Sequence, residues 1–327
     1  MAIGLAVNVE RWPLANVFTI ARGSKTEAVV VVAEISRDGH VGRGECVPYA
    51  RYGETVDGVV ALIESQRDAI GAGLDRVTLQ HAIPAGAARN ALDCAFWDLE
   101  AKMAGKPVWA IAGLPQPGPV TTAYTLSLGD PEAMGEAAAK AAHRPLLKVK
   151  LGTSDDAARI AAVRRHAPQS KLIIDANEGW SADNLALNLA ACVEAGVTLI
   201  EQPLSAADDV ALADIERIVP VCADESLHDR ATLAKLAGRY DAINIKLDKA
   251  GGLTEAIALA RDATALGLDI MIGCMVGTSL AMAPALLLAR QARVVDLDGP
   301  LLLTWDREPG LRYEGSLVYP AEAALWG

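Results

Sequence analysis

Short apolar runs recur from residue 121 onward at a nearly constant spacing. The runs begin at residues 121, 146, 171, 198, 221, 242, 269 and 294, so consecutive starts lie 21 to 27 residues apart. Each run is typical of a buried β-strand, and an Ala/Leu-rich stretch typical of a helix follows it. Strands that alternate with helices predict βαβ units and a parallel sheet. Eight such strands predict a closed β/α barrel. An open doubly wound sheet is the alternative, but no G-x-G-x-x-G motif follows any strand.

The first 115 residues have a different pattern. A run rich in β-branched residues, interrupted at Asp38-Gly39, predicts a β-hairpin over residues 27–46. Residues 87–105 have helical periodicity and end at Gly105, a common helix-terminating residue. Strands followed by helices predict a smaller α+β domain in this part of the chain.

A Pro/Gly-rich segment, residues 113–120, marks the boundary between these two patterns. We therefore predict an α+β domain over residues 1–115 and a barrel domain over residues 116–303. Residues 304–327 are too few to form a domain, and we expect them to pack back on the first one.

Polar residues gather at the C-terminal ends of the predicted strands, which form the catalytic face of a β/α barrel. A single acid at such a position is often only a helix N-cap, but polar residues at seven strand ends make that explanation improbable. The residues are Thr125, Lys148, Lys150, Asp175, Asn177, Glu201, Asp224, Glu225, Lys246, Asp248, Asp296 and Asp298.

Three of these acids, Asp175, Glu201 and Asp224, end the third, fourth and fifth strands. Neighbouring strands lie about 4.8 Å apart, so three inward carboxylates would converge and repel one another unless a cation lies among them. Oxygen ligands without His or Cys favour a hard ion such as Mg²⁺. Asn177 and Glu225 lie beside these acids in the sequence, and we expect them to support the metal ligands.

Lysines flank the predicted metal site on two strands. Lys148 and Lys150 are two residues apart on the second strand and face the same way, while Lys246 ends the sixth strand, on the opposite side of the barrel. Burial and a nearby cation are expected to lower the pKa values of Lys150 and Lys246, so that they can exchange protons. Two opposed amines beside a metal predict proton removal from one face of a carbon and its return to the other.

The composition of the chain limits the partners and the cell compartment that we expect. The net charge is −11, which argues against nucleic acid or an anionic membrane as the main partner. Five dispersed cysteines are typical of a reducing compartment, and the N-terminus lacks a secretory signal pattern, so we expect a cytoplasmic protein. Residues 270–289 carry no charge, but Gly273, Gly277 and Pro284 predict a strand, a turn and a helix rather than a membrane span.

The motifs KVK, IIDAN, EQPL, ADES and NIKLDKAGG, in this order and spacing, resemble the enolase superfamily in its muconate lactonizing enzyme subgroup. This resemblance implies an α/β fold: a (β/α)7β modified TIM barrel with an α+β capping domain. It also implies that Lys150 and Lys246 are the acid/base pair and that Asp175, Glu201 and Asp224 hold one Mg²⁺ per subunit. No His ends the sixth or seventh strand, so the His-based mandelate racemase branch fits poorly.

Residues of the eighth strand limit the range of possible substrates. Asp296 and Asp298 are two residues apart and face the same way, a pair suited to binding an ammonium group. This D-x-D pattern resembles the dipeptide epimerases, especially the L-Ala-D/L-Glu epimerases, in which it binds the free N-terminus of the dipeptide. The resemblance assigns Thr125, Lys148 and the backbone at Met275 to substrate binding.

One position departs from that group. The residue that contacts the glutamate side chain is Arg in some of these epimerases and Lys25 here, which keeps the charge but loses the two-pronged geometry. Arg22 is a candidate to compensate, and Tyr49, Tyr52 and Gly53 are candidates for a second closing loop. A solvated charge at Lys25 is the alternative interpretation.

We therefore predict a Mg²⁺-dependent epimerase of L-Ala-D/L-Glu dipeptides, an activity suited to murein peptide recycling. N-acylamino acid racemase and o-succinylbenzoate synthase are the alternatives within the superfamily, because they need no ammonium-binding pair. A Schiff-base aldolase would leave the three acids unexplained. A non-catalytic barrel is the last alternative. The predicted partner is a small dipeptide, and assembly into a homo-oligomer stays open.

Overall fold

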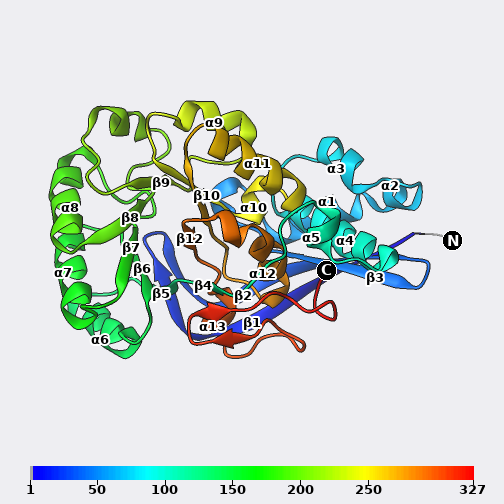
Figure 1. The fold of residues 1–327 in the computed structure, drawn as a ribbon, viewed down its shortest axis with the longest axis horizontal. Helices are drawn as coiled ribbons and strands as arrows, with labels where there is room; N and C mark the ends of the chain where they lie inside the picture. The colour runs from blue at the N-terminus through cyan, green and yellow to red at the C-terminus, as the bar shows by residue number, and fades with distance from the viewer. Residues whose placement is uncertain (1–2) are drawn as a thin grey trace.

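The structure is a computed structural model that describes residues 3–327. Its larger part is an eight-stranded parallel sheet whose strands follow one another in sequence order (Figure 1). The strands are β5 (Tyr124–Leu126), β6 (Leu146–Lys150), β7 (Lys171–Asp175), β8 (Val197–Glu201), β9 (Val221–Ala223), β10 (Ala242–Ile245), β11 (Asp269–Ile272) and β12 (Val294–Val295). The amide of Ala123 donates to the carbonyl of Val295 at 2.8 Å and links the first strand region to the last. All eight predicted strands are thus confirmed.

The connections between strands form the outer layer of the barrel. They are α6 (Pro131–Ala141), α7 (Asp156–His166), α8 (Ala182–Glu194), η2 (Asp209–Asp214), α9 (Arg230–Leu236), α10 (Leu247–Ala250), α11 (Leu253–Ala265), α12 (Ser279–Ala285) and η3 (Leu286–Gln291). The prediction of an α-helix after every strand is wrong between β8 and β9, where η2 is a short 3₁₀ helix. In that connection the Asp209 carboxylate is buried and accepts hydrogen bonds from Ser226 and Tyr240.

The interior of the barrel is filled by apolar side chains below its polar end. Ala123, Ile173, Leu199, Cys222, Ala242, Met271 and Val294 form a buried cluster. Three of these residues precede the acids by two positions: Ile173 before Asp175, Leu199 before Glu201 and Cys222 before Asp224. Because side chains alternate along a strand, the residue two positions later faces the same interior. The apolar cluster is therefore the floor beneath the polar residues.

The capping part begins with a three-stranded antiparallel sheet of β1 (Gly4–Ile20), β2 (Gly23–Arg37) and β3 (His40–Cys46). The predicted hairpin turn is confirmed, with Asp38 and Gly39 both at positive φ. Five helices follow: α1 (Val56–Glu64), α2 (Arg67–Gly71), α3 (Arg76–Ala82), α4 (Ala87–Ala104) and α5 (Val108–Ile111), with η1 (Ala50–Tyr52) between β3 and α1. The long β1–β2 hairpin extends from the capping helices to the barrel (Figure 1).

Helix α4 is buried on nearly every side because it lies between the capping sheet and the barrel. Against the sheet it meets Gly42 and Gly44, where an added Cβ would come within 2.2 and 2.1 Å of α4 carbonyl oxygens. Against the barrel, the carboxylate of Asp93 accepts the amide of Thr254 at 2.9 Å, and Arg89 donates to the carbonyl of Ala250 at 2.8 Å. Small residues and polar pairs thus allow one helix to hold both parts together.

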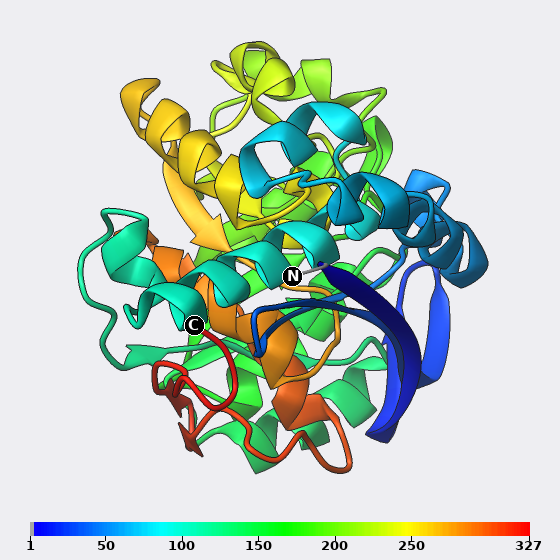
Figure 2. The same cartoon turned by 90° about the vertical axis from the view of Figure 1, so that its right-hand side faces the viewer.

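The C-terminal segment contacts both parts of the molecule. Strands β13 (Tyr313–Glu314) and β14 (Leu317–Val318) form a small sheet with β4 (Val120–Thr121), after α13 (Gly299–Leu302). The last residue lies beside helix α4 (Figure 2), where the amide of Gly327 donates to Asp98 at 2.8 Å.

The uncharged stretch 270–289 contains β11, a loop and α12, as predicted, and ends in the first residues of the 3₁₀ helix η3. Among residues 3–327 no helix is both long enough and apolar enough to cross a membrane.

Asp248 at the interface of the two parts predicts a pH dependence of stability. It accepts the amide of Val47 at 3.0 Å and the side chain of Asn90 at 2.9 Å, and burial raises its pKa to about 7. The folded state then holds a proton that the unfolded chain loses near pH 4, so the unfolding free energy falls as pH rises from about 4 to 7. We expect Asp248→Asn to keep both acceptor bonds and to reduce this fall by more than about 1 kcal/mol. Urea unfolding of both proteins at several pH values measures it, and parallel curves would contradict it.

Candidate active site

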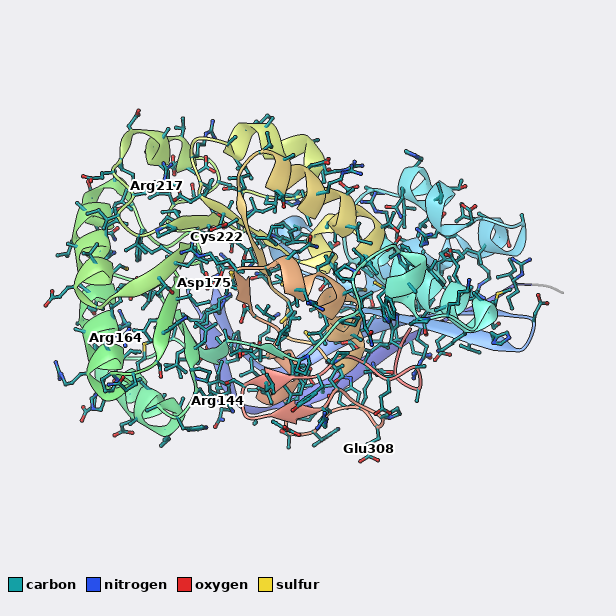
Figure 3. All side chains as sticks on the ribbon, in the orientation of Figure 1. Arg144, Arg164, Asp175, Arg217, Cys222 and Glu308 are labelled. Carbon is teal, nitrogen blue, oxygen red and sulfur yellow. The ribbon has the colours of Figure 1, made fainter. Side chains whose placement is uncertain are left out.

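Three carboxylates meet at the polar end of the barrel. Asp175, Glu201 and Asp224 are buried, and each offers an oxygen within 4.8 Å of the others. Asp175 lies in the interior of the molecule, whereas Arg164 lies on the outer helical layer (Figure 3). Three adjacent strands, β7 to β9, deliver these acids because each strand reaches the same end with the same side-chain parity.

The three acids differ in their pKa shifts. Burial opposes ionisation of all three, but neighbouring lysines lower the pKa values of Asp175 and Asp224 below the usual value. Burial and the charge of Asp175 raise the pKa of Glu201 to about 8. Burial is the largest cause of this shift, and the charges of Asp175 and Asp224 add to it, while Lys148 and Lys246 oppose it. The site thus favours a cation.

Lys148 lies among the carboxylates. Its Nζ is 2.6 Å from Glu201 Oε2, 2.7 Å from Asp296 Oδ2 and 3.1 Å from Asp175 Oδ2. The ammonium group is buried, yet these three acids raise its pKa well above the usual value. Lys148 therefore stays charged and links the acid cluster to the eighth strand.

Lys150 and Lys246 contact opposite ends of the row of acids. Lys150 donates to Asp175 Oδ2, and Lys246 donates to Asp224 Oδ2 at 2.6 Å. Asp175 ends β7 and Asp224 directly follows β9, and these strands lie on either side of the Glu201 strand. A carbon atom held above Glu201 would have an amine on each side.

We expect a lowered pKa for Lys246 from the sequence, but the surrounding protein groups raise it. Burial lowers it, but Asp224 and Glu201 raise it more, and the result lies well above the usual value. A carboxylate 2.6 Å away stabilises the ammonium form. A lowered pKa therefore requires a positive charge that competes for Asp224.

Two residues that the sequence reasoning did not assign hold the acids in place. Lys249 donates to Asp224 Oδ1 at 2.6 Å and to the carbonyl of Asn244 at 3.2 Å, and Asn244 Nδ2 donates to Glu201 Oε1 at 2.7 Å. Asn244 precedes Lys246 by two residues on one strand, so strand parity could have identified it. Lys249 follows the strand in helix α10, and only its burial distinguishes it from a surface lysine.

Asn177 and Glu225 lie beside the acids but differ in their contacts. The backbone amide of Asn177 donates to Asp175 Oδ1 at 3.0 Å, whereas Glu225 accepts a hydrogen bond from the guanidinium group of Arg22 at 2.7 Å. Within residues 3–327, Asn177 Oδ1 and Glu225 Oε2 are buried and accept no hydrogen bond. Unpaired buried oxygens beside three carboxylates fit a hard divalent cation with further oxygen or water ligands.

The eighth strand places a second pair of acids across from the first three. Asp298 accepts the amide of Thr125 at 2.6 Å, and Asp296 is held by Lys148 through one oxygen. The other oxygen of Asp296, Oδ1, is buried without a hydrogen-bond partner in the described chain. This oxygen is available to a donor on a bound molecule.

A cavity of about 460 Å³ lies between these groups and the capping residues. Its lining includes Lys150, Lys246, the two acids that follow β12 and Met275 from the loop after β11. From the capping side it is lined by the tip of the β1–β2 hairpin and by η1 with its preceding residue Tyr49. The cavity therefore joins every group that the sequence analysis assigned to substrate or proton transfer.

Three capping cations, Arg22, Lys25 and Arg51, border this cavity, and Arg51 is paired with Glu178. Arg22 donates to Glu225 at 2.7 Å, to Tyr49 at 3.0 Å and to the carbonyl of Asn177 at 3.0 Å. Lys25 has no salt bridge to a described residue, and its Nζ lies 5.6 Å from the centre of the Tyr49 ring. Lys25 is thus the cation available to an acidic ligand, while Arg22 joins the hairpin to the barrel loops.

The chain matches two family models along most of its length. Residues 2–113 match the mandelate racemase/muconate lactonizing enzyme N-terminal domain, and residues 133–305 match the enolase C-terminal domain-like family. The chain belongs to the enolase superfamily. The predicted family and fold class are confirmed.

Two characterised relatives are similar over nearly the whole chain. The L-Ala-D/L-Glu epimerase of Escherichia coli K12 is 48% identical, and the alignment covers 93% of this chain and 95% of the relative. The N-acetyl-D-glutamate racemase of a Pseudoalteromonas species is 46% identical, with coverage of 91% and 95%.

Solved structures show the same similarity. An enolase family member from Agrobacterium tumefaciens with homology to dipeptide epimerases, bound to sodium and L-Ala-L-Glu, has a TM-score of 0.97 and 55% identity over 99% of this chain and all of that one. The dipeptide epimerase of Enterococcus faecalis, bound to Mg and L-Leu-L-Tyr, has a TM-score of 0.91 and 30% identity, with 98% of both chains covered.

The acid cluster predicts tight metal binding that depends on each ligand. We expect Asp175→Asn to weaken Mg²⁺ binding at least about tenfold, because it removes one of three anionic oxygen ligands. Titration calorimetry on metal-free protein measures this without any substrate. Asp269→Asn, at the exposed start of β11, is the matched control and should bind Mg²⁺ as the wild type does. Equal affinities in all three proteins would contradict the assignment.

Proposed function

We propose that this protein is a Mg²⁺-dependent dipeptide epimerase that inverts the α-carbon of the second residue of L-Ala-D/L-Glu. The observation that carries the proposal is the pair Lys150 and Lys246 at opposite ends of the Asp175–Glu201–Asp224 row. The similarity to dipeptide epimerases, including one crystallised with Mg, supports the substrate class and the metal.

The acids of β7 to β9 would hold the metal, which when bound supplies positive charge that makes the proton next to a substrate carboxylate more acidic. Lys150 or Lys246 removes that proton from one face of the α-carbon, and the other lysine returns a proton to the opposite face. Lys148 stays charged beside them and helps balance the enediolate negative charge. Removal and return from opposite faces inverts the carbon.

The ends of the dipeptide find partners in the same cavity. The free ammonium group would donate to Asp296 Oδ1, which is buried and otherwise unpaired, with Asp298 beside it. Thr125 and the backbone at Met275 border the same region. The side-chain carboxylate of the second residue would contact Lys25, because Arg22 is already paired with Glu225.

This chemistry also supports proposals for the domain organisation, the cell compartment and the partners. We propose that residues 1–115, completed by 304–327, cap a catalytic barrel of residues 116–303. We further propose that the protein acts in the cytoplasm on small peptides released from murein, with neither nucleic acid nor membrane as a partner. The net charge of −11 supports this last point.

Racemisation of N-acetylglutamate is the second candidate, because a relative with that activity is 46% identical to this chain. The two candidates differ at the amine, which is cationic in a dipeptide and an uncharged amide in an N-acyl substrate. The unpaired Asp296 oxygen favours the cation, since the uncharged amide of an N-acyl substrate would leave this carboxylate without a counter-charge beyond Lys148.

A direct comparison of substrates in deuterated water tests the proposal. We expect the Mg²⁺-loaded protein to give L-Ala-L-Glu and L-Ala-D-Glu a one-unit mass gain at least about a hundredfold faster than N-acetyl-L-glutamate, because the acyl form offers no ammonium group to the buried Asp296 Oδ1. Mass spectrometry of timed samples measures both. Faster exchange of the N-acetyl substrate would move the assignment to the second candidate.

Single lysine variants test the two-sided scheme. In Lys150→Ala or Lys246→Ala we expect net epimerisation to fall at least about a thousandfold, because one face has lost its acid/base group. Each variant should still exchange the α-hydrogen of one epimer, and the two variants should prefer opposite epimers. NMR of each epimer in deuterated water reads this out. Loss of exchange from both epimers in both variants would contradict the scheme.

A further inference from the structure

A second cavity lies directly behind the wall of the first. It has a volume of about 380 Å³ and lies between the capping helices and the barrel residues that follow β9 and β10. Of all described residues, only Tyr52 lines both this cavity and the proposed substrate cavity. Its side chain is therefore the partition between them.

Tyr52 is held firmly in this position. Its backbone amide donates to the carbonyl of Tyr49 at 3.0 Å within η1, and its ring meets that of His228 edge-on at 4.7 Å. The preceding residue, Arg51, forms two hydrogen bonds of 2.8 Å to Glu178 of the barrel. A ring fixed from both the capping and the barrel side is a rigid wall rather than a mobile side chain.

The wall stands at the reacting end of the substrate cavity. Burial raises the pKa of the Tyr52 hydroxyl, and Asp224 and Lys246 are the charged groups that act on it most strongly. The hydroxyl forms no hydrogen bond with any residue in the described range 3–327. Tyr52 also lines the same cavity as Asp224 and Lys246, so it borders the region in which a side chain on the inverted carbon would extend.

The space behind the wall has its own chemistry. Glu54 and Asp248 line it together with the small residues Gly53, Gly58 and Gly86. Neither acid is paired with a cation: Glu54 accepts the backbone amides of Tyr49 and Ala87, and Asp248 accepts that of Val47. Burial raises the pKa of Asp248 to about 7, and a cation bound beside it would lower that pKa again and favour the carboxylate. Lys249 also borders the space, but its charge is matched by Asp224. A long cationic side chain fits this lining best.

We propose that Tyr52 is a specificity-determining residue that limits the length of the second side chain of the dipeptide and closes off an acidic cavity able to hold an extended cationic one. The inference rests on the proposed dipeptide epimerase activity and adds a size limit to it. Shortening the ring would join the two cavities and shift preference from L-Ala-L-Glu toward L-Ala-L-Arg.

The test measures the ratio of kcat/KM for L-Ala-L-Arg to that for L-Ala-L-Glu in wild type, Tyr52→Ala and Tyr52→Phe. We expect the ratio to rise at least about tenfold in Tyr52→Ala, because a pocket wall commonly sets discrimination of this size. Tyr52→Phe keeps the ring and should keep the wild-type ratio. A Tyr52→Ala ratio within about threefold of wild type would overturn the proposal.

Further arms keep the result unambiguous. Tyr52→Leu replaces Tyr52→Ala if the latter does not fold, as judged by thermal unfolding and Mg²⁺ binding, and the same rise is expected.

L-Ala-L-Phe as a further substrate separates side-chain length from charge, since an equal gain for L-Ala-L-Phe and L-Ala-L-Arg would overturn the cationic preference. Calorimetric binding of L-Ala-L-Arg to the Mg²⁺-loaded proteins should strengthen only when the ring is removed. Because binding needs no turnover, a wild type that exchanges neither epimer would refute the proposed function and still leave the wall tested.

Discussion

The structure depends on the repulsion among three buried carboxylates at the end of a parallel barrel. Asp175, Glu201 and Asp224 are brought within 4.8 Å because their strands are adjacent and share one side-chain parity. Lys148 contacts two of them, and further lysines contact both outer acids. Burying so many charges is stable only if each has a partner, so the cluster fixes the surrounding side chains. The same charges that make the site costly to fold make it suited to a cation.

One short helix links the capping part to this cluster, in addition to the contacts of Arg22 with Glu225 and Asn177. Helix α10 carries Asp248, which binds the amide of Val47 on the capping side, and the adjacent Lys249, which binds Asp224 on the barrel side. Gly252 follows at positive φ, and an added Cβ there would lie 2.5 Å from Asp93 of α4. Displacing the capping helix would therefore disturb a residue that holds an acid of the site. The two parts are built as a single catalytic unit.

Contacts between residues far apart in the chain could not be predicted from the sequence. The positions of the acids followed from strand parity, but whether Arg22 or Lys25 is available to a ligand did not. Glu225, 203 residues from Arg22, decides this by pairing with it. In the same way the lysine pKa values depend on acids contributed by other strands, so the lowering expected for Lys246 is reversed in the protein alone. Charge balance is a property of the assembled site.

The sequence by itself determined the strand repeat, the barrel, the acids and lysines at its polar end, and the family. Those features depend on local periodicity, since a strand of alternating side chains places every second residue on one face wherever it folds. Only the tertiary structure decided that Lys249 and Asn244 hold the acids, and that Tyr52 separates two cavities. These contacts depend on which loops meet at the interface between the capping helices and the barrel. The spacing of residues along the chain does not determine which loops meet there.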